Sequence, residues 1–155
     1  MEESVSLLGQ IRHQFGGKAQ DVRSYSPLPL AYLGDAVYDL IIRSVLVGQA
    51  NRPVNELNQR AEAYVNAKAQ SRLMERILDC LTEEEAAVYR RGRNAHPRSA
   101  ARNASWKDYR EATGLEALIG YLYLTERVSR ILELVKAGIE KSGEKEIPWT
   151  QNTAP

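Results

Sequence analysis

The sequence lacks the features of several large protein classes. It has one cysteine, Cys80, among 155 residues, which excludes an internal disulfide framework and a cysteine-based zinc site. Its longest stretch without a charge, residues 24–34, contains two prolines and is much shorter than the ~20 apolar residues of a membrane-spanning helix. The first residues include Glu2 and Glu3 and form no apolar run of the secretory type. We therefore expect a cytoplasmic protein without a membrane partner.

An excess of one charge sign and the common catalytic loops are missing as well. The net charge is +1, so overall charge does not indicate a polyanionic partner. The sequence has no glycine-rich phosphate loop and no Gly-x-Ser-x-Gly pattern, and His13 and His96 do not have metal-ligand spacing. Sustained period-two alternation with hairpin turns is also absent, which argues against β-sheets. We predict an all-α fold with five to seven helices.

The most distinctive stretch that is present is the predicted helix 28–47. Nearly every residue after Pro29 is apolar or small on all sides of the helical wheel, a pattern typical of a buried helix. Its three charged residues, Asp35, Asp39 and Arg43, are four residues apart and share one narrow stripe. A buried carboxylate needs an opposite charge or a metal. The spacing leaves open whether Asp35 pairs with an arginine or binds a metal, whereas Asp39 is expected to pair with Arg43 or to lie at the rim of a site.

Helical spacing and capping signals locate the other predicted elements. Thr82 and Glu85 form a capping box, and Thr125 is placed to cap the last helix. The predicted helices, besides 28–47, cover residues 5–11, 53–81 with one break, 82–91, 106–124 and 125–139. We expect one domain over residues 26–140, preceded by a lead-in over 1–25 and followed by a flexible tail over 141–155.

Helix 106–124 also carries a single charge in an apolar setting. Between Ala112 and Leu124, Glu116 is the only ionisable acid or base apart from tyrosines. Gly120 lies one turn later on the same face and would let another helix approach closely. A crossing of the two apolar helices would bring Asp35 and Glu116 together. Two adjacent carboxylates repel each other unless they share a proton or a cation, and oxygen ligands of this kind suit Mg²⁺.

Basic residues are concentrated just before this helix. The segment from Arg90 to Arg110 holds seven of the 21 lysines and arginines, against Asp108 as its only acid. Such a segment can bind the phosphates of a polyanion, giving affinity and position without sequence information. The alternative is a solvated loop with scattered arginines. Our candidates for contacting such a polyanion are Arg90, Arg91, Arg93, His96, Arg98, Arg102 and Lys107.

Two of these segments resemble motifs of the ribonuclease III family. Residues 33–37, Leu-Gly-Asp-Ala-Val, resemble the core of the family's signature helix, and residues 115–120, Leu-Glu-Ala-Leu-Ile-Gly, resemble its second acidic motif. The resemblance covers about residues 26–138. Residues 30–36 and 64–70 make the sequence similar to the Mini-ribonuclease III members, which lack the double-stranded-RNA-binding domain of ordinary ribonuclease III, and we expect none here.

The resemblance implies the helical endonuclease-domain fold and an Mg²⁺-dependent endoribonuclease that cleaves double-stranded RNA. Asp35 and Glu116 would be its catalytic and metal-binding residues, and the products would carry 5′-phosphate and 3′-hydroxyl ends. It also implies a two-fold homodimer in which the signature helices pack together and each subunit cuts one strand. The implied substrate is precursor 23S ribosomal RNA, with a ribosomal protein assisting.

The sequence departs from the family pattern at two carboxylate positions in the first motif and one in the second. Leu-Pro-Leu-Ala at residues 28–31 replaces a run with two acids, and Thr113 replaces an aspartate. Because Mini-ribonuclease III is similar in this respect, we expect one Mg²⁺ held partly through water, to which Thr113 could contribute. The rival interpretation is a non-catalytic ribonuclease III-like RNA-binding structural module, against which the retention of both acids argues. A third is an all-α scaffold that binds no nucleic acid.

Overall fold

The computed structural model describes residues 6–18, 21–95 and 105–142, and this part of the chain is helical without strands. Two short 3₁₀ turns, Val22–Ser24 and Leu78–Cys80, join longer helices. The α-helices are α1 (Leu7–Phe15), α2 (Pro27–Gln49), α3 (Val54–Val65), α4 (Ala67–Ile77), α5 (Glu83–Arg93), α6 (Trp106–Leu124) and α7 (Val128–Glu140). The all-α prediction is therefore confirmed. None of these helices is both long enough and apolar enough to cross a membrane.

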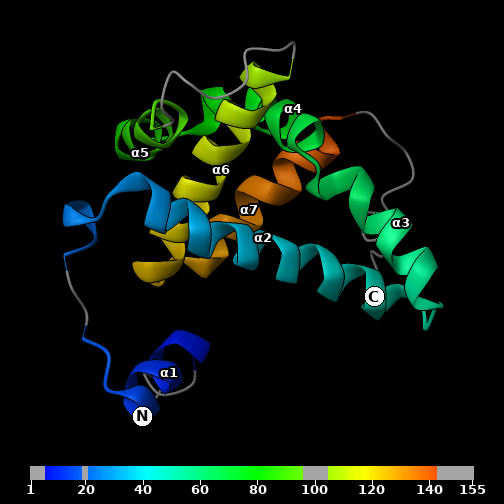
Figure 1. Cartoon of the computed structure of the whole chain (residues 1–155), viewed down its shortest axis with the longest axis horizontal. Coiled ribbons are helices and arrows are strands. Elements are labelled where there is room, and N and C mark those ends of the chain that lie inside the picture. Colours follow the sequence, from blue (N-terminus) through cyan, green and yellow to red (C-terminus); the bar gives the residue numbers. More distant parts are fainter. Residues whose placement is uncertain (1–5, 19–20, 96–104, 143–155) are drawn as a thin grey trace.

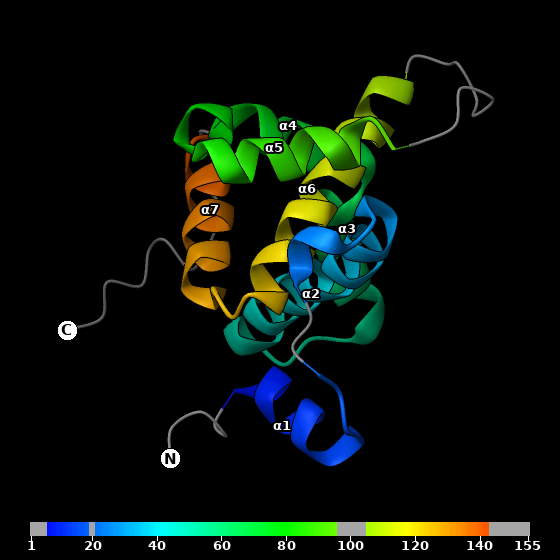
Figure 2. The ribbon, with the colours of Figure 1, turned by 90° about the vertical axis from the view of Figure 1, so that its left-hand side faces the viewer.

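Helix α6 lies at the centre of the fold. It packs most extensively against α2, α5 and α4, which surround it in two nearly perpendicular views (Figures 1 and 2). Along residues 111–122 every residue of α6 is buried except Glu116, which is partly exposed. A helix enclosed in this way must be apolar nearly all round, as the sequence indicated.

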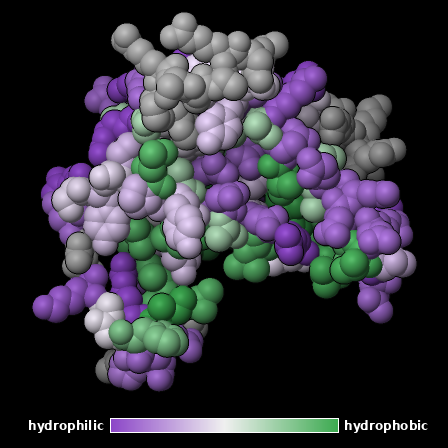
Figure 3. Space-filling view, in the orientation of Figure 1, coloured by the Kyte–Doolittle hydropathy of each residue, from purple (hydrophilic) through white to green (hydrophobic). Residues whose placement is uncertain are grey.

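Helix α2 is buried on one side only. Tyr38 and Ile42 have 1% and 0% of their surface exposed, but Tyr32 and Val47 have 86% and 59% exposed. The prediction that this helix is buried all round is therefore wrong for the single chain. Figure 3 shows hydrophobic surface along the lower edge of the view, beside α1 and α2.

Polar side chains set the ends of the central helices. The break between α3 and α4 falls at Asn66, earlier than the position between Lys68 and Leu73 that the helical spacing predicts. The Asn66 side chain accepts a hydrogen bond from the Ala69 backbone N–H at 2.8 Å. The capping box of Thr82 and Glu85 is present at the start of α5. The prediction for Thr125 is wrong, because this residue ends α6 and its hydroxyl donates to a carbonyl of that helix, so that α7 begins only at Val128.

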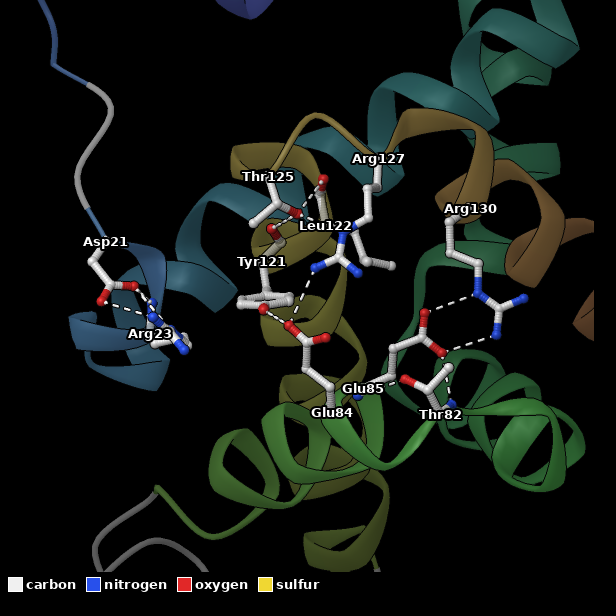
Figure 4. Close-up of polar contacts among 10 residues, drawn as sticks. All are labelled: Asp21, Arg23, Thr82, Glu84, Glu85, Tyr121, Leu122, Thr125, Arg127 and Arg130. Carbon is white, nitrogen blue, oxygen red and sulfur yellow. Dashed lines mark hydrogen bonds and ion pairs between the residues drawn. The ribbon is translucent and has the colours of Figure 1, made fainter.

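A buried ion pair ties α5 to α7 (Figure 4). Glu85 is 2% exposed, and Arg130 donates to its two carboxylate oxygens at 2.8 and 2.9 Å. The hydrogen bonds from Arg130 lower the pKa of Glu85. Beside this pair, the Tyr121 hydroxyl donates to Glu84, and Arg127 lies 3.3 Å from the same carboxylate. These contacts hold α5 against the C-terminal half of α6 and the start of α7.

Candidate active site

The site is built on the crossing of α2 and α6, where two glycines bring the helix backbones into contact. A Cβ atom added to Gly34 would lie 1.7 Å from the carbonyl oxygen of Glu116, and one added to Gly120 would lie 2.0 Å from that of Leu30. No other amino acid fits such a contact without moving a helix. The sequence-based prediction of a close crossing at these glycines agrees with this geometry.

The crossing brings the carboxylates of Asp35 and Glu116 within hydrogen-bond reach of each other. Burial raises the pKa of the Glu116 carboxyl to about 8, and a hydrogen bond and charge repulsion from Asp35 act in the same direction. Glu116 is partly buried, whereas Asp35 is exposed, so the pair opens to solvent. Two acids 81 positions apart in the sequence thus form a pair that favours binding a proton or a cation.

Helix α4 adds Gln70, to which sequence reasoning gave no role. Its side chain is within hydrogen-bond reach of the Glu116 carboxylate, and this contact lowers the Glu116 pKa against the raising effects. Gln70 is 2% exposed, and its amide nitrogen donates to the Val65 carbonyl at 3.0 Å. The sequence signal that could have pointed to Gln70 was its position in segment 64–70, which contributed to the family resemblance.

Two further sequence candidates have local partners. Asp39 forms an ion pair with Arg43 one turn later, at 3.1 Å, as expected from their spacing. Thr113 is buried, and its hydroxyl donates to the carbonyl of Tyr109 in the same helix at 3.0 Å. Within the described ranges no cluster of three or more histidine, cysteine, aspartate or glutamate residues could hold a metal.

Four of the seven basic candidates lie in the described part of the chain. Arg90 is exposed, Arg91 donates to the Tyr25 carbonyl at 2.9 Å, and Arg93 lies over the ring of Tyr89. Lys107 forms ion pairs with Glu75 at 2.6 Å and with Glu111 at 3.5 Å. The other three, His96, Arg98 and Arg102, lie outside the described residues.

The arginine-rich end of α5 packs against α6, the helix that carries Glu116. A Cβ atom added to Gly92 would lie 2.7 Å from the Cβ of Ala117, the residue that follows Glu116. The bond from Arg91 to Tyr25 ties the same end of α5 to the segment that leads into α2. The residues around Arg90 to Arg93 are therefore in contact with α6 and bonded to the segment just before α2.

Known proteins share this chain's sequence and fold. Residues 28–127 match the family described as the ribonuclease III domain. The chain is 49% identical over 139 residues to a Mini-ribonuclease 3 from Thermoanaerobacter sp. (strain X514), covering 88% of this chain and 98% of that protein. It is 46% identical over 127 residues to a Mini-ribonuclease 3 from Enterococcus faecalis, covering 81% and 96%. A crystal structure of a Fusobacterium nucleatum protein aligns with a TM-score of 0.70 at 36% identity, over 79% of this chain and 98% of that one.

Proposed function

Because this chain belongs to the ribonuclease III family and is an endoribonuclease, we propose that it cleaves double-stranded RNA with Mg²⁺ held by Asp35 and Glu116. The observation that carries the proposal is the meeting of these two carboxylates at an opening of the α2–α6 crossing. Members of the ribonuclease III family act on double-stranded RNA, and the proposal assigns the same class of substrate to this chain.

The donor set fits Mg²⁺. Asp35 and Glu116 supply two carboxylates within hydrogen-bond reach of each other, and the Gln70 side chain forms a hydrogen bond with Glu116 that lowers its pKa. Mg²⁺ prefers oxygen ligands and keeps several waters, so it is commonly bound through one or two carboxylates. With two carboxylates at the crossing we expect one ion in each site.

Each residue of the pair has a distinct part in the proposed reaction. A bound Mg²⁺ supplies the Lewis acidity that activates water and offsets charge on the scissile phosphate. Glu116 would have to lose its proton before it could hold the ion, and Asp35, which is exposed, would hold the ion on the side open to solvent. The helix crossing fixes the spacing of both acids. Hydrolysis would leave 5′-phosphate and 3′-hydroxyl ends, as the family resemblance implies.

The basic end of α5 is proposed to contact the RNA backbone. The exposed side chain of Arg90 is accessible to phosphates, and Arg91 and Arg93 lie within one turn of it. Contacts of this kind position a duplex without reading its sequence. His96, Arg98 and Arg102 remain candidates from the sequence, whereas Lys107 would first have to leave Glu75 and Glu111.

The exposed apolar side of α2 supports a homodimer. Four large side chains of this helix, those of Leu28, Tyr32, Leu40 and Val47, have 41% to 86% of their surface exposed. An apolar face of this kind is typical of a protein interface. We propose that α2 packs against its counterpart in a second copy, so that two sites act on opposite strands.

The biological substrate is proposed from the family resemblance alone. It is precursor 23S ribosomal RNA, trimmed near its ends with the help of a ribosomal protein bound to the RNA. A cytoplasmic location is proposed together with that substrate.

The decisive test is cleavage of duplex RNA across a titration of Mg²⁺. Asp35→Asn should reduce the rate at least about a thousandfold, while duplex binding and sedimentation as a dimer stay close to wild type. Asp79→Asn is the matched control, because Asp79 is an exposed carboxylate near Lys141, away from the crossing, and should cleave normally. Cleavage by Asp35→Asn at the wild-type rate would refute the assignment, and a wild-type protein that binds duplex without cutting it would favour the structural-module alternative.

A further inference from the structure

Two aromatic rings lie together at the start of α6. Trp106 and Tyr109 are stacked, with their ring centroids 5.9 Å apart and their planes inclined by 27°. Large aromatic side chains contribute most to a fold when they are buried, but Tyr109 keeps 48% of its surface exposed and Trp106 is only partly buried. Within the described residues, neither ring belongs to the hydrophobic core. The pair therefore presents aromatic surface to solvent.

This aromatic pair is aligned with the carboxylate site along the same helix. Tyr109 precedes Glu116 by seven residues, which is nearly two helical turns, so the two residues share one face of α6 to within about 20°. At a rise of about 1.5 Å per residue, they are about 10 Å apart along the helix axis. Residues 111–115 between them are buried. An RNA strand that follows this face from Glu116 therefore reaches Tyr109 within a few nucleotides.

Hydrogen bonds hold the first turns of α6 beside the arginine-rich end of α5. Arg110 donates from Nε to the Arg93 carbonyl at 3.1 Å and from Nη2 to the Asn94 side-chain oxygen at 2.9 Å. The aromatic pair is therefore fixed next to the end of α5 that is proposed to bind the RNA backbone. Phosphate contacts at that end would position a strand without reading its bases, which leaves the neighbouring rings available to contact a base.

The chemistry of the two rings selects one kind of nucleotide. Every nucleobase has a π-face, and stacking on aromatic side chains holds single-stranded bases with little dependence on their identity. A base inside a continuous duplex is already stacked on its neighbours, whereas a base in a bulge, a loop or a free end can be turned outward onto a protein ring. The ligand that suits this exposed pair is therefore an unpaired base.

From this arrangement we propose that Trp106 and Tyr109 form a stacking platform for one unpaired nucleotide of the RNA, beside the carboxylate site. The inference rests on the proposed function and refines its substrate, because a duplex interrupted by an unpaired nucleotide would be bound more tightly than a continuous one. The alternative is a structural role, since apolar side chains three residues apart also stabilise a helix.

The test compares the binding of two labelled RNAs by fluorescence anisotropy in EDTA, which removes the metal proposed for cleavage. One is a fully paired duplex, and the other is the same duplex with one unpaired adenosine near its middle. Wild type should bind the second at least about fivefold more tightly, the lower end of the contribution of stacking on one base. Tyr109→Ala should bind both RNAs with equal affinity, whereas Tyr109→Phe keeps the ring and should retain the preference.

Phe15→Ala is the matched control for loss of an exposed ring. Phe15 is 85% exposed on α1, which lies at the opposite end of the molecule from the start of α6 in both views (Figures 1 and 2), so this variant should also retain the preference. A second readout reports stacking directly. In Trp149→Phe, Trp106 is the only tryptophan left, and its fluorescence should be quenched by the RNA with the unpaired adenosine more strongly than by the paired duplex.

The outcomes separate stacking from its alternatives. Equal affinity of wild type for the two RNAs, or equal quenching by them, would overturn the proposal. A purely structural role would lower the melting temperature of Tyr109→Ala and leave its preference for the unpaired adenosine unchanged, which would also overturn it. If Tyr109→Ala does not fold, the quenching comparison decides alone. A wild type that cuts the paired duplex in Mg²⁺ without any preference refutes only the platform, whereas one that binds and cuts neither RNA refutes the proposed function as well.

Discussion

Replacing Gly34 by alanine tests the helix crossing on which the site depends. The added Cβ would lie 1.7 Å from the Glu116 carbonyl oxygen and 2.7 Å from the Gly120 nitrogen. Because both neighbours are backbone atoms, α2 and α6 must separate by roughly 1.3 Å to restore even a tight 3.0 Å contact. Overpacking of this kind costs about 1–3 kcal/mol or more, and alanine's better helix propensity returns at most about 1 kcal/mol.

We therefore expect Gly34→Ala to lower the free energy of unfolding by about 2 kcal/mol and the melting temperature by roughly 4–8 °C, measured by urea and thermal unfolding. Separation of the helices would also move Glu116 away from Asp35, and a misplacement of ~1 Å can cost about a hundredfold in rate. Gly48→Ala is the control on the same helix, since nothing lies within 4 Å of a Cβ there, and it should be neutral or slightly stabilising. Equal stability of the two variants would refute the close crossing.

Two further predictions concern ionisable groups. Arg130→Met should lower the free energy of unfolding in urea by about 3 kcal/mol, because it leaves the buried Glu85 carboxylate without its partner. Arg43→Met, which breaks an exposed ion pair, is the control and should change the free energy of unfolding by less than about 0.5 kcal/mol. Equal effects of the two substitutions would contradict the prediction. The pKa of Glu85 is lowered from 4.5 in the folded protein, so the ionised Glu85 carboxylate stabilises the fold above pH 4.5. This stabilisation should be lost as the pH falls below 4.5 in wild type, whereas Arg130→Met should show no such loss. For Glu116 the pH dependence of stability is reversed, because its pKa is raised from 4.5 to about 8. In EDTA, without metal, the free energy of unfolding of wild type should fall by at least about 1 kcal/mol relative to that of Glu116→Gln between pH 5 and pH 8. Parallel pH profiles of the two proteins would show that the Glu116 pKa is not perturbed.

Local sequence signals predicted most of the fold. The capping box at Thr82 and the apolar character of α6 both depend on residues close together in the chain. The prediction for Thr125 failed because a threonine hydroxyl can cap the start of one helix or bond back into the end of another, and spacing does not distinguish the two. Burial of α2 was overestimated because periodicity shows that a face is apolar, not what covers it.

The helices and the two isolated acids could be predicted from the sequence alone, since a single charge in an apolar helix is visible without coordinates. Which groups lie together at the helix crossing could not be predicted in this way. In the structure, Gln70 of α4 forms a hydrogen bond with Glu116, and Lys107 forms ion pairs with Glu75 and Glu111. The physical reason is that helix periodicity specifies which side of a helix faces inward, whereas the partner that a polar group meets there depends on how separate helices cross.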